Sequence, residues 1–562
     1  MKKNISLSLI FSLLIAVLSA QNKPLEVVYH KLSDGKVDTS YIFKMQYFKG
    51  VSYFSKADDK TQAFIDYNRE LLVDIIENDG QIYKSTEVFD SLPKPKYSDD
   101  TETILGYKCK KATYSSFSNT IEVWYSHQPK AKGSPYRAYG PKDALVLKVS
   151  INGGRMLIAT EINQLPKETI LDYPFAKAKE ITKAEYREIE IESRYTTFNV
   201  FEKEQINWGD SIVNPEPNRS NVLYRFAGGT VIMKKVKLPE LCKEGAQTFV
   251  KLTNWSNGDA YDRTGSLFTI SGKKDLSVLD AYYANSIEPL PVFTDNNGNE
   301  YQGLISTDDY EVPVEWMRFF TSFGVSHFNN MRPINNYNWQ DSVVYKQEIT
   351  QLIPNDEDEI WIGVAIGNYD SGGHYVSLDL QIYPPWEPEE VAVKYINPLF
   401  YTINTMEMLG QNYGKMFDND TLVTDFMIPK DLEDLNLLFT TTGHGGWGGG
   451  DEFNPKLNQV FIDGELVFSI TPWRTDCGTY RLSNPASGNF SNGLSSSDLS
   501  RSNWCPATLT PPYLVPLKNL KAGKHTIEVV IDQGKNDGNG FSAWCISGVI
   551  IGNEKLTEKP LN

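Results

Sequence analysis

Apolar and polar residues alternate with a period of two in many short stretches of this chain. Clear examples are IEIE at residues 189–192, YVSLDLQI at residues 375–382 and IEVVI at residues 527–531. Successive side chains of a strand point to opposite faces, so this pattern predicts half-buried strands. Few windows longer than about 10 residues repeat with the helical period. The chain is therefore predicted to be mainly β, with antiparallel sandwiches as the expected architecture.

Short turn sequences separate these stretches. They include DNNG at residues 295–298, DG at residues 463–464 and NDGNG at residues 536–540. The first of them superficially resembles a calcium-binding loop. Its glycine falls at the fourth position and no distant glutamate is suitably spaced, so we expect a hairpin turn instead.

The length of 562 residues leaves room for three or four domains. Two breaks in composition divide it. One is a stretch rich in Lys and Glu near residues 165–200, and the other is PPWEP at residues 384–388, which cannot lie in a central strand. The expected parts are an N-terminal domain at 21–170, a linker at 171–199, and two β domains at 200–384 and 389–558.

The N-terminus has the features of a secretory signal peptide. A basic MKK is followed by an apolar stretch at residues 5–18 and by the small residues Ser19 and Ala20. We therefore expect residues 1–20 to be cleaved and the protein to be secreted or periplasmic. The apolar stretch is too short to anchor the chain, and no later segment is long and apolar enough to span a membrane.

The five cysteines are too few for a disulfide scaffold. Cys477 and Cys505 lie 28 residues apart in one Gly/Ser/Asn-rich region, and we expect them to be bonded. Closing a loop of that size stabilises a fold by about 3–4 kcal/mol. Cys109 is expected to be a buried free thiol, and the pairing of Cys242 and Cys545 is left open.

Composition excludes several classes of function. With 71 acidic and 55 basic residues the net charge is −16, so we expect no nucleic-acid partner. The six histidines are scattered, without HExxH or paired-cysteine spacing, so no metal site is expected. No GxSxG or P-loop motif occurs, and no cofactor is predicted. The aromatic content of 12% fits either strand packing or sugar binding.

Three polar stretches could carry a reaction. NGDAYDR at residues 257–263 places Asp262 and Arg263 in a turn before an apolar strand, although such a pair also occurs in surface turns. TTGHGGWGGGDEF at residues 441–453 is a glycine-rich loop that ends on acids, and a plain flexible loop is the alternative. RSNWCP at residues 501–506 places an Arg and a Trp beside the expected disulfide, where the Trp could stack on a sugar or pack internally.

In this order and spacing, the three stretches resemble the bacterial peptide-N-glycosidase F family over about residues 200–555. The supporting motifs are YDR at 261–263, GH at 443–444, GDEF at 450–453, RSNWCP at 501–506 and DGNGFSAWCISGVI at 537–550. The resemblance implies two side-by-side, eight-stranded antiparallel jelly rolls with the active site in the cleft between them.

The resemblance also implies roles for single residues. Asp262 corresponds to the essential catalytic Asp, Arg263 to its neighbour and Glu452 to a second acid. The corresponding cleft-lining residues are Arg501, Trp504 and His444. We also expect Trp447, Tyr369 and Asp370 to bind substrate. The chain departs from the family after residue 361, where Gly367 and Tyr369 stand without a carboxylate until Asp370, and Trp447 follows the Gly-His pair instead of preceding it.

The N-terminal block has a separate likeness. GYKCKKA at 106–112, VWYS at 123–126 and GPKDALVL at 140–147 resemble the GLPGLI family of exported β-rich bacterial proteins. An extension of this kind is similar to that of the second, N-terminally extended type of peptide-N-glycosidase, whose extra domain is bowl-like. The block holds no acid or base constellation, so we expect an accessory role.

The implied reaction is hydrolysis of the amide between GlcNAc and an Asn side chain of N-linked glycoproteins and glycopeptides, giving Asp and a glycosylamine. Asp262 would activate water, Arg263 and Arg501 would stabilise charge, and Glu452 would bind the proximal sugar hydroxyls. A monomer is expected. Two alternatives are a glycosidase that cuts within the glycan core and a non-catalytic glycan-binding protein.

Overall fold

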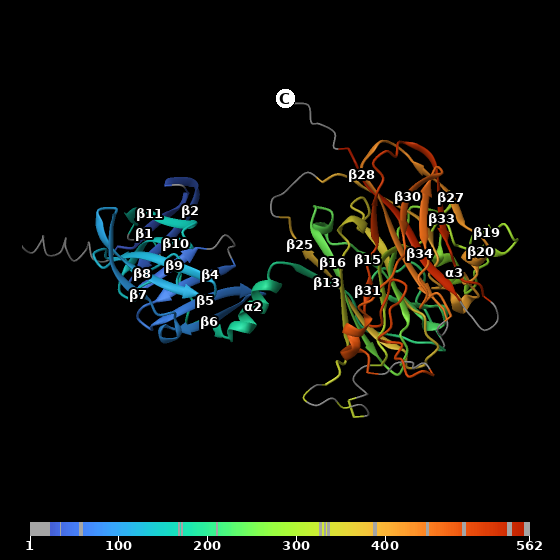
Figure 1. The fold of residues 1–562 in the computed structure, drawn as a ribbon, viewed down its shortest axis with the longest axis horizontal. Helices are drawn as coiled ribbons and strands as arrows, with labels where there is room; N and C mark the ends of the chain where they lie inside the picture. Colours follow the sequence, from blue (N-terminus) through green and yellow to red (C-terminus); the bar gives the residue numbers. More distant parts are fainter. Residues whose placement is uncertain are drawn as a thin grey trace, which may run out of the picture. The chain divides into compact units, whose positions relative to one another are not determined.

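The strands dominate the fold, as predicted (Figure 1). The computed structural model describes residues 23–33, 35–55, 60–166, 169, 172–209, 212–324, 329–330, 333, 336, 338–385, 391–445, 449–485, 491–536 and 542–555. It divides into two compact units, Met1–Arg194 and Tyr195–Asn562. The expected signal peptide and Trp447 lie outside the described residues. Among the helices described, none is long and apolar enough to cross a membrane.

The first unit is built on one sheet, in which the described strands follow the order β12-β6-β5-β4-β3-β2-β1-β11-β10-β9-β8-β7. All neighbours are antiparallel except β12 and β6. The strands are β1 (Leu25–Ser33), β2 (Lys36–Phe48), β3 (Val51–Ser55), β4 (Thr61–Asp66), β5 (Leu71–Asn78), β6 (Gln81–Val88), β7 (Lys96–Ile104), β8 (Tyr107–Ser116), β9 (Asn119–Ser126), β10 (Leu145–Ile151), β11 (Arg155–Gln164) and β12 (Lys179–Glu180).

One predicted strand of this unit is a helix. Residues 189–192 belong to α2 (Lys183–Glu192), so the strand expected from IEIE is wrong. The helix begins at a capping box, in which Thr182 Oγ1 accepts from the Glu185 amide and the Glu185 carboxylate accepts from the Thr182 amide. The buried residues Tyr186 and Glu190 are four apart, which is the helical spacing. An alternation of four residues is too short to outweigh these signals.

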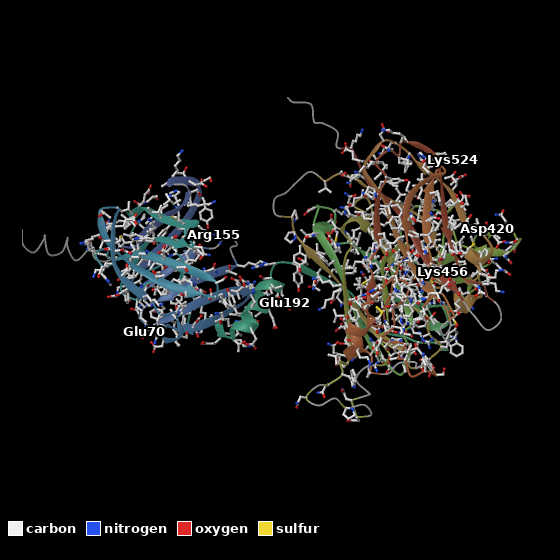
Figure 2. All side chains as sticks on the ribbon, viewed as in Figure 1. Glu70, Arg155, Glu192, Asp420, Lys456 and Lys524 are labelled. Carbon is white, nitrogen blue, oxygen red and sulfur yellow. A yellow bond between two sulfur atoms is a disulfide. The ribbon has the colours of Figure 1, made fainter. Side chains whose placement is uncertain are left out.

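Residues 179–192 therefore fold with the first unit, although they lie in the segment expected to be a linker. The side chain of Tyr186 donates to the carbonyl of Ile75 on β5, and β12 pairs with β6. Cys109 is a buried free thiol in this unit, as predicted. Charged side chains such as Glu70 and Arg155 lie on the outside of the sheet (Figure 2).

In the second unit, the first jelly roll has two antiparallel sheets. We call them sheets I and II, in the strand orders β13-β25-β16-β23 and β14-β15-β24-β17-β22-β31. Their strands are β13 (Thr196–Ile206), β14 (Leu223–Phe226), β15 (Val231–Lys237), β16 (Gln247–Ser256), β17 (Thr264–Ile270), β22 (Val314–Phe320), β23 (Val343–Glu348), β24 (Glu359–Ile366), β25 (His374–Tyr383) and β31 (Leu509–Thr510).

The second jelly roll contains sheets III and IV, in the orders β26-β34-β28-β32 and β27-β33-β29-β30, which make eight strands in the part described. Figure 1 shows β13, β16 and β25 on one side of this unit and β27, β30 and β33 on the other. The strands are β26 (Lys394–Tyr401), β27 (Leu422–Ile428), β28 (Leu432–His444), β29 (Asn458–Ile462), β30 (Glu465–Ile470), β32 (Tyr513–Pro516), β33 (Gly523–Ile531) and β34 (Ala543–Glu554).

Sheet II shares one hydrophobic core with sheet I and is hydrogen-bonded through side chains to strands of sheet III, so it lies between them. All seven residues of β22 are buried, whereas buried and exposed residues alternate in β27 at the surface. A strand that is covered on both faces buries every side chain, so the two charged residues of β22, Glu315 and Arg318, pair with each other. Strand β31 comes from the C-terminal part of the chain but pairs with β22, joining the two jelly rolls.

Shorter elements complete the second unit. Two of the three predicted turns are confirmed there, whereas most of the third, at residues 536–540, lies outside the described residues. Residues 295–298 connect β19 (Val292–Thr294) to β20 (Glu300–Gln302), and residues 463–464 connect β29 to β30. The remaining elements of both units are α3 (Val278–Ala284), α4 (Met416–Asn419), β18 (Leu276–Ser277), β21 (Tyr310–Glu311) and the 3-10 helices η1 (Phe89–Ser91), η2 (Ala227–Gly229), η3 (Glu240–Cys242), η5 (Thr350–Leu352), η6 (Glu407–Leu409) and η7 (Cys477–Ser483).

Candidate active site

A cavity of about 300 Å³ opens where one end of sheet II meets one end of sheet III. Its walls come from the beginning of β17, the end of β24, the end of β28 and the beginning of β34, together with residues that follow β26. Side chains from both jelly rolls therefore face the same space. The polar and charged side chains that line it include Asp262, Arg263, Tyr369, Glu407 and His444.

Asp262 lies in the loop at residues 257–263, which connects β16 to β17. Both neighbours of Asp262 are tied to Thr321. The Thr321 hydroxyl donates to the carbonyl of Tyr261 at 2.9 Å, and the Arg263 amide donates to the Thr321 hydroxyl at 2.8 Å. These two bonds hold the backbone on either side of Asp262, so its carboxylate has a fixed position.

Arg501 joins the two predicted acids. Its Nη1 lies 3.0 Å from Asp262 Oδ2 and also donates to Glu452 Oε1, while Nη2 donates to the carbonyl of Ser496 at 2.6 Å. The Arg501 side chain is 1% exposed, against 17% for Asp262 and 20% for Glu452. One buried cation thus faces two carboxylates, of which Asp262 belongs to the first jelly roll and Glu452 to the loop after β28.

Two carboxylates sharing one cation do not both ionise easily. Burial raises the pKa of Glu452 to about 8, and the charge of Asp262 adds to that effect against the opposing attraction of Arg501. Burial also raises the pKa of Asp262, again opposed by Arg501. The two acids therefore titrate as a coupled pair around one cation, and Glu452, whose pKa is raised to about 8, is largely protonated at neutral pH.

Arg263 does not pair with its sequence neighbour Asp262. Its Nε donates to Asp259 Oδ2 at 2.7 Å, and Asp259 also lies 3.4 Å from Nε2 of the buried His374. These partners lower the pKa of Asp259 to about 2 despite its burial. Arg263 lines the cavity and lies between the rings of Tyr261 and Tyr369, at 4.9 and 5.9 Å from their centroids.

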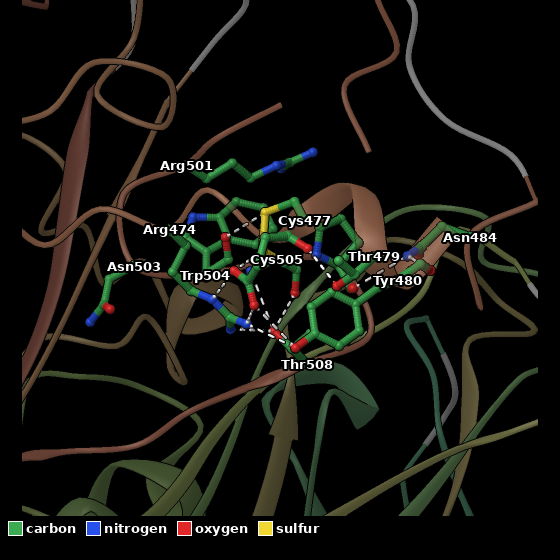
Figure 3. The surroundings of a disulfide bond; sticks show 12 residues. Arg474, Cys477, Thr479, Tyr480, Asn484, Arg501, Asn503, Trp504, Cys505 and Thr508 are labelled. Atoms are coloured by element: carbon green, nitrogen blue, oxygen red, sulfur yellow. Dashed lines mark hydrogen bonds and ion pairs between the residues drawn. A yellow bond between two sulfur atoms is a disulfide. The ribbon is translucent and has the colours of Figure 1, made fainter. Parts of the chain in front are cut away.

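The disulfide between Cys477 and Cys505 is present, as predicted, with its Cα atoms 5.2 Å apart. Figure 3 shows Trp504 beside it, with Arg501 above. Trp504 is only 3% exposed, and its ring lies between the Arg501 guanidinium, 4.3 Å from the centroid, and the ring of Phe320, also at 4.3 Å. Its Nε1 donates to the carbonyl of Gly443 at 2.9 Å. Trp504 therefore packs internally, which is one of the two alternatives that the sequence left open, and its ring supports the Arg501 guanidinium.

The other residues expected to bind substrate are placed differently from one another. His444 lines the cavity. Tyr369 is 54% exposed and its hydroxyl donates to Glu407 Oε1 at 2.5 Å. Asp370 accepts from the amides of Gly372 and Gly373, which makes it a turn residue, and it does not line the cavity.

Glu407 is the carboxylate that the sequence analysis missed. It lies in η6, on the chain that follows β26, and lines the same cavity as Asp262. No motif surrounds it in the sequence, so only the fold brings it beside Tyr369. Gly367, on the segment where the resemblance implies a glutamate, leaves open space, because an added Cβ would meet its nearest neighbour at 3.9 Å.

No group of three or more His, Cys, Asp or Glu side chains within the described residues is arranged to hold a metal ion. Arg501 contacts both acids, and Arg263 and His444 line the cavity together with Asp262.

Known families match three parts of the chain. "Peptide-N-glycosidase F, N terminal" matches residues 197–382, and "Peptide-N-glycosidase F, C terminal" matches residues 412–551. "N-glycanase peptide, N-terminal domain" matches residues 65–188. No curated protein matches the chain.

Among solved structures, the chain is similar to PNGF-II. The structure of PNGF-II in the P21 space group has 41% sequence identity over 95% of this chain and 100% of that chain, with a TM-score of 0.84. The structure of PNGF-II in the C2 space group has 41% identity over 96% and 100%, with a TM-score of 0.78. The chain therefore belongs to the peptide-N-glycosidase F family and carries the N-terminal domain of its second type.

Proposed function

We propose that this protein is a secreted peptide-N-glycosidase that hydrolyses the amide between GlcNAc and Asn in N-linked glycoproteins. The observation that carries the proposal is the contact of buried Arg501 with Asp262 and Glu452, which come from loops of different jelly rolls, with Asp262 lining the cavity. Cys545 and Ser266 also line the cavity, but burial raises the pKa of the Cys545 thiol to about 11 and the Ser266 hydroxyl donates to Glu315. A carboxylate base assisted by cations is therefore the simplest arrangement for cleaving an amide.

In the proposed reaction, Asp262 accepts a proton from the water that attacks the amide carbonyl carbon. The carbon–nitrogen bond then breaks, and the nitrogen leaves with the sugar as a glycosylamine after taking up a proton. The proton held by Asp262 is the one that the leaving nitrogen needs. The peptide retains the attacking oxygen as part of a new Asp carboxylate.

The charged residues around Asp262 have the remaining roles in the proposed reaction. Arg501 orients Asp262, and Arg263 faces the cavity with its charge partly balanced by Asp259. Both cations favour the negative charge that develops on the amide oxygen. Glu452, whose pKa is raised to about 8, is protonated at neutral pH and can donate a hydrogen bond to a hydroxyl of the proximal sugar.

The rim of the cavity suits a neutral carbohydrate. Tyr369 and Tyr261 are more than half exposed, and Trp208, 42% exposed, meets the edge of Tyr369 with ring centroids 6.3 Å apart. Exposed aromatic faces stack on the apolar faces of sugar rings. The net charge of −16 also favours a neutral ligand over a polyanion.

Export is the second part of the proposal. The disulfide between Cys477 and Cys505 supports it, because structural disulfides persist in oxidising compartments. The expected signal peptide at residues 1–20 supplies the route. Terminal sequencing of the protein recovered outside the cytoplasm should give a chain that starts near Gln21, and recovery of uncleaved cytoplasmic protein would contradict export.

The reaction is tested with one defined N-glycopeptide in heavy-oxygen water. A peptide-N-glycosidase converts the glycosylated Asn to Asp and places one heavy oxygen in that side chain, which mass spectrometry detects. A glycosidase that cuts within the core would leave one GlcNAc on the peptide and put the heavy oxygen in the released sugar. An unchanged glycopeptide that still binds would favour the non-catalytic alternative.

A further inference from the structure

Behind the cavity, a buried arginine connects the two jelly rolls. Arg318 on β22 has a fully buried side chain and pairs with Glu315 at 2.8 Å. Its Nη1 also reaches across to the second jelly roll, where it donates to Thr442 Oγ1 on β28 at 3.1 Å and to the carbonyl of Cys545 on β34. The position of the Thr442 hydroxyl is therefore set by a cation of the other domain.

The donors and acceptors around Thr442 determine where its proton goes. A guanidinium can only donate, so Thr442 Oγ1 uses a lone pair toward Arg318. The same oxygen lies 2.8 Å from Nε2 of His444. Among the described residues, this ring nitrogen is the only acceptor within reach of the hydroxyl proton, which is directed to it.

A ring nitrogen that accepts a hydrogen bond carries no hydrogen. In a neutral imidazole the proton is then on the other nitrogen, Nδ1. The ring of His444 packs at a tilt against the stacked pair of Trp504 and Phe320, with ring centroids 5.4 Å from Trp504 and 5.8 Å from Phe320. His444 lines the cavity, and no described residue accepts a hydrogen bond from its Nδ1.

The surroundings also keep His444 uncharged. Burial lowers its pKa to about 3, and the cations of Arg318 and Arg501 add to that effect. The thiol of Cys545, which also lines the cavity, is neutral because burial raises its pKa to about 11. The carboxylate of Glu315 is already bonded to Arg318.

We propose that Arg318 and Thr442 are positioning residues that hold His444 in its neutral Nδ1–H form, and that Nδ1–H donates a hydrogen bond to an oxygen of the bound substrate. This inference rests on the proposed function. It makes His444 a fixed donor rather than an acid or base. A rigid donor in a partly desolvated site favours a substrate oxygen without reorganisation during the reaction.

The tautomer can be read without measuring activity. The chain has six histidines, so isotope-labelled histidine gives a small set of ring-nitrogen signals in long-range proton–nitrogen spectra. Comparison with His444→Asn identifies the signals of His444. We expect protonated Nδ1 and unprotonated Nε2, unchanged between about pH 8 and about pH 5. A proton on Nε2, or on both nitrogens at about pH 6, would overturn the proposal.

Two matched pairs of variants test the donor. Asn places its amide nitrogen near the position of Nδ1, whereas Gln places it near Nε2, so His444→Asn should retain about tenfold more kcat/KM than His444→Gln. Thr442→Val keeps the shape but loses the hydroxyl, and should lower kcat/KM about tenfold and shift the His444 signals, while Thr442→Ser should stay within about twofold of wild type.

The outcomes separate the two proposals. If the wild-type chain leaves glycopeptides uncut, the proposed function fails, while the nitrogen spectra still test the tautomer. If it cuts them but Thr442→Val changes neither the spectra nor kcat/KM, the proposed positioning of His444 by Arg318 and Thr442 is wrong. It is also wrong if His444→Gln is as active as His444→Asn. Thermal unfolding of each variant checks that a loss of activity does not come from a loss of fold.

Discussion

At the scale of single residues, the site depends on an imbalance of charge around Arg501. A single buried guanidinium contacts Asp262 and Glu452, and both carboxyl groups have raised pKa values because they are removed from water. An arrangement with one cation and two acids gives one group that accepts a proton and one that holds it. The two predictions for these acids differ accordingly.

The first prediction concerns the base. Asp262→Asn removes the proton acceptor but keeps the size of the side chain, so kcat should fall by about a hundredfold to ten-thousandfold with little change in unfolding temperature. Asp370→Asn is the matched control, because Asp370 caps its own turn and does not line the cavity. Near wild-type turnover by Asp262→Asn would place the base elsewhere, with Glu407 and Glu452 as the remaining carboxylates of the site.

The second prediction concerns pH and stability. A carboxyl group with a raised pKa binds its proton more tightly in the folded than in the unfolded state. Its contribution to the free energy of unfolding is therefore fully present below about pH 4.5 and is lost as the pH rises toward about 8. Glu452→Gln does not ionise and escapes this loss. The variant should therefore gain unfolding temperature relative to wild type between about pH 5 and about pH 8.

The exposed Glu433 provides a control for this effect. Glu433→Gln should show a difference from wild type that stays flat over the same pH range. If the Glu452→Gln difference is equally flat in differential scanning measurements, the carboxyl group of Glu452 is not penalised by burial.

At the scale of elements, the reacting groups are carried by loops that leave the ends of strands, and the glycines next to them make room. Gly443, near the end of β28, lies against the indole of Trp544 and the side chain of Ser502. An added Cβ would come within 2.7 Å of Trp544 Cζ2 and 2.8 Å of Ser502 Cβ. This close approach explains why a glycine precedes His444 and why the loop of Arg501 can pack against the strand.

The third prediction follows from this packing. Gly443→Ala must displace Trp544 or Ser502, so it should destabilise the protein by about 1–3 kcal/mol and lower turnover by moving the neighbouring Arg501. Gly367→Ala is the matched control, because its Cβ would meet nothing nearer than 3.9 Å. Urea unfolding and kcat/KM check both variants. Equal stability of the two would contradict the assigned role of Gly443.

At the scale of the whole molecule, the chain contains two units that each have their own core. In the first unit, clusters of buried residues include Val27, Leu147 and Phe64, and helix α2 packs on its sheet. In the second, the cores lie within each jelly roll and between sheets II and III. All residues proposed for catalysis belong to the second unit.

The fourth prediction is that Tyr195–Asn562 folds and cleaves glycopeptides without the first unit. The boundary at Tyr195 keeps α2 with its own sheet and leaves β13 intact. Turnover of a denatured glycopeptide should match that of the full chain within about twofold, because both groups of site loops remain. Size-exclusion chromatography must first show a single species, since removal of a domain can expose an apolar surface.

A monodisperse truncated protein that is inactive on the glycopeptide would refute the accessory role of the first unit. A protein that is active on the glycopeptide but slow on an intact glycoprotein would assign the first unit to recognition of the protein substrate.

Several features of the fold were determined by local sequence. Alternation over eight residues in YVSLDLQI predicted β25, and the turn residues at 463–464 predicted the hairpin of β29 and β30. These predictions succeeded because strand period and turn chemistry are properties of neighbouring residues. The strand predicted from the four residues IEIE is wrong for the same reason. The helix start at Thr182 lies outside those four residues, so the short alternation could not reveal it.

The resemblance to the family also brought Asp262, Glu452 and Arg501 together as candidates, through motifs in a fixed order. Only the tertiary structure decided that Arg263 pairs with Asp259, that Trp504 is buried beneath Arg501, and that Glu407 reaches the cavity. Each of these contacts joins side chains whose distance depends on how sheets and loops pack. The pattern that predicts a strand depends on adjacent residues, whereas the pairing of a buried charge depends on which distant group the fold places beside it.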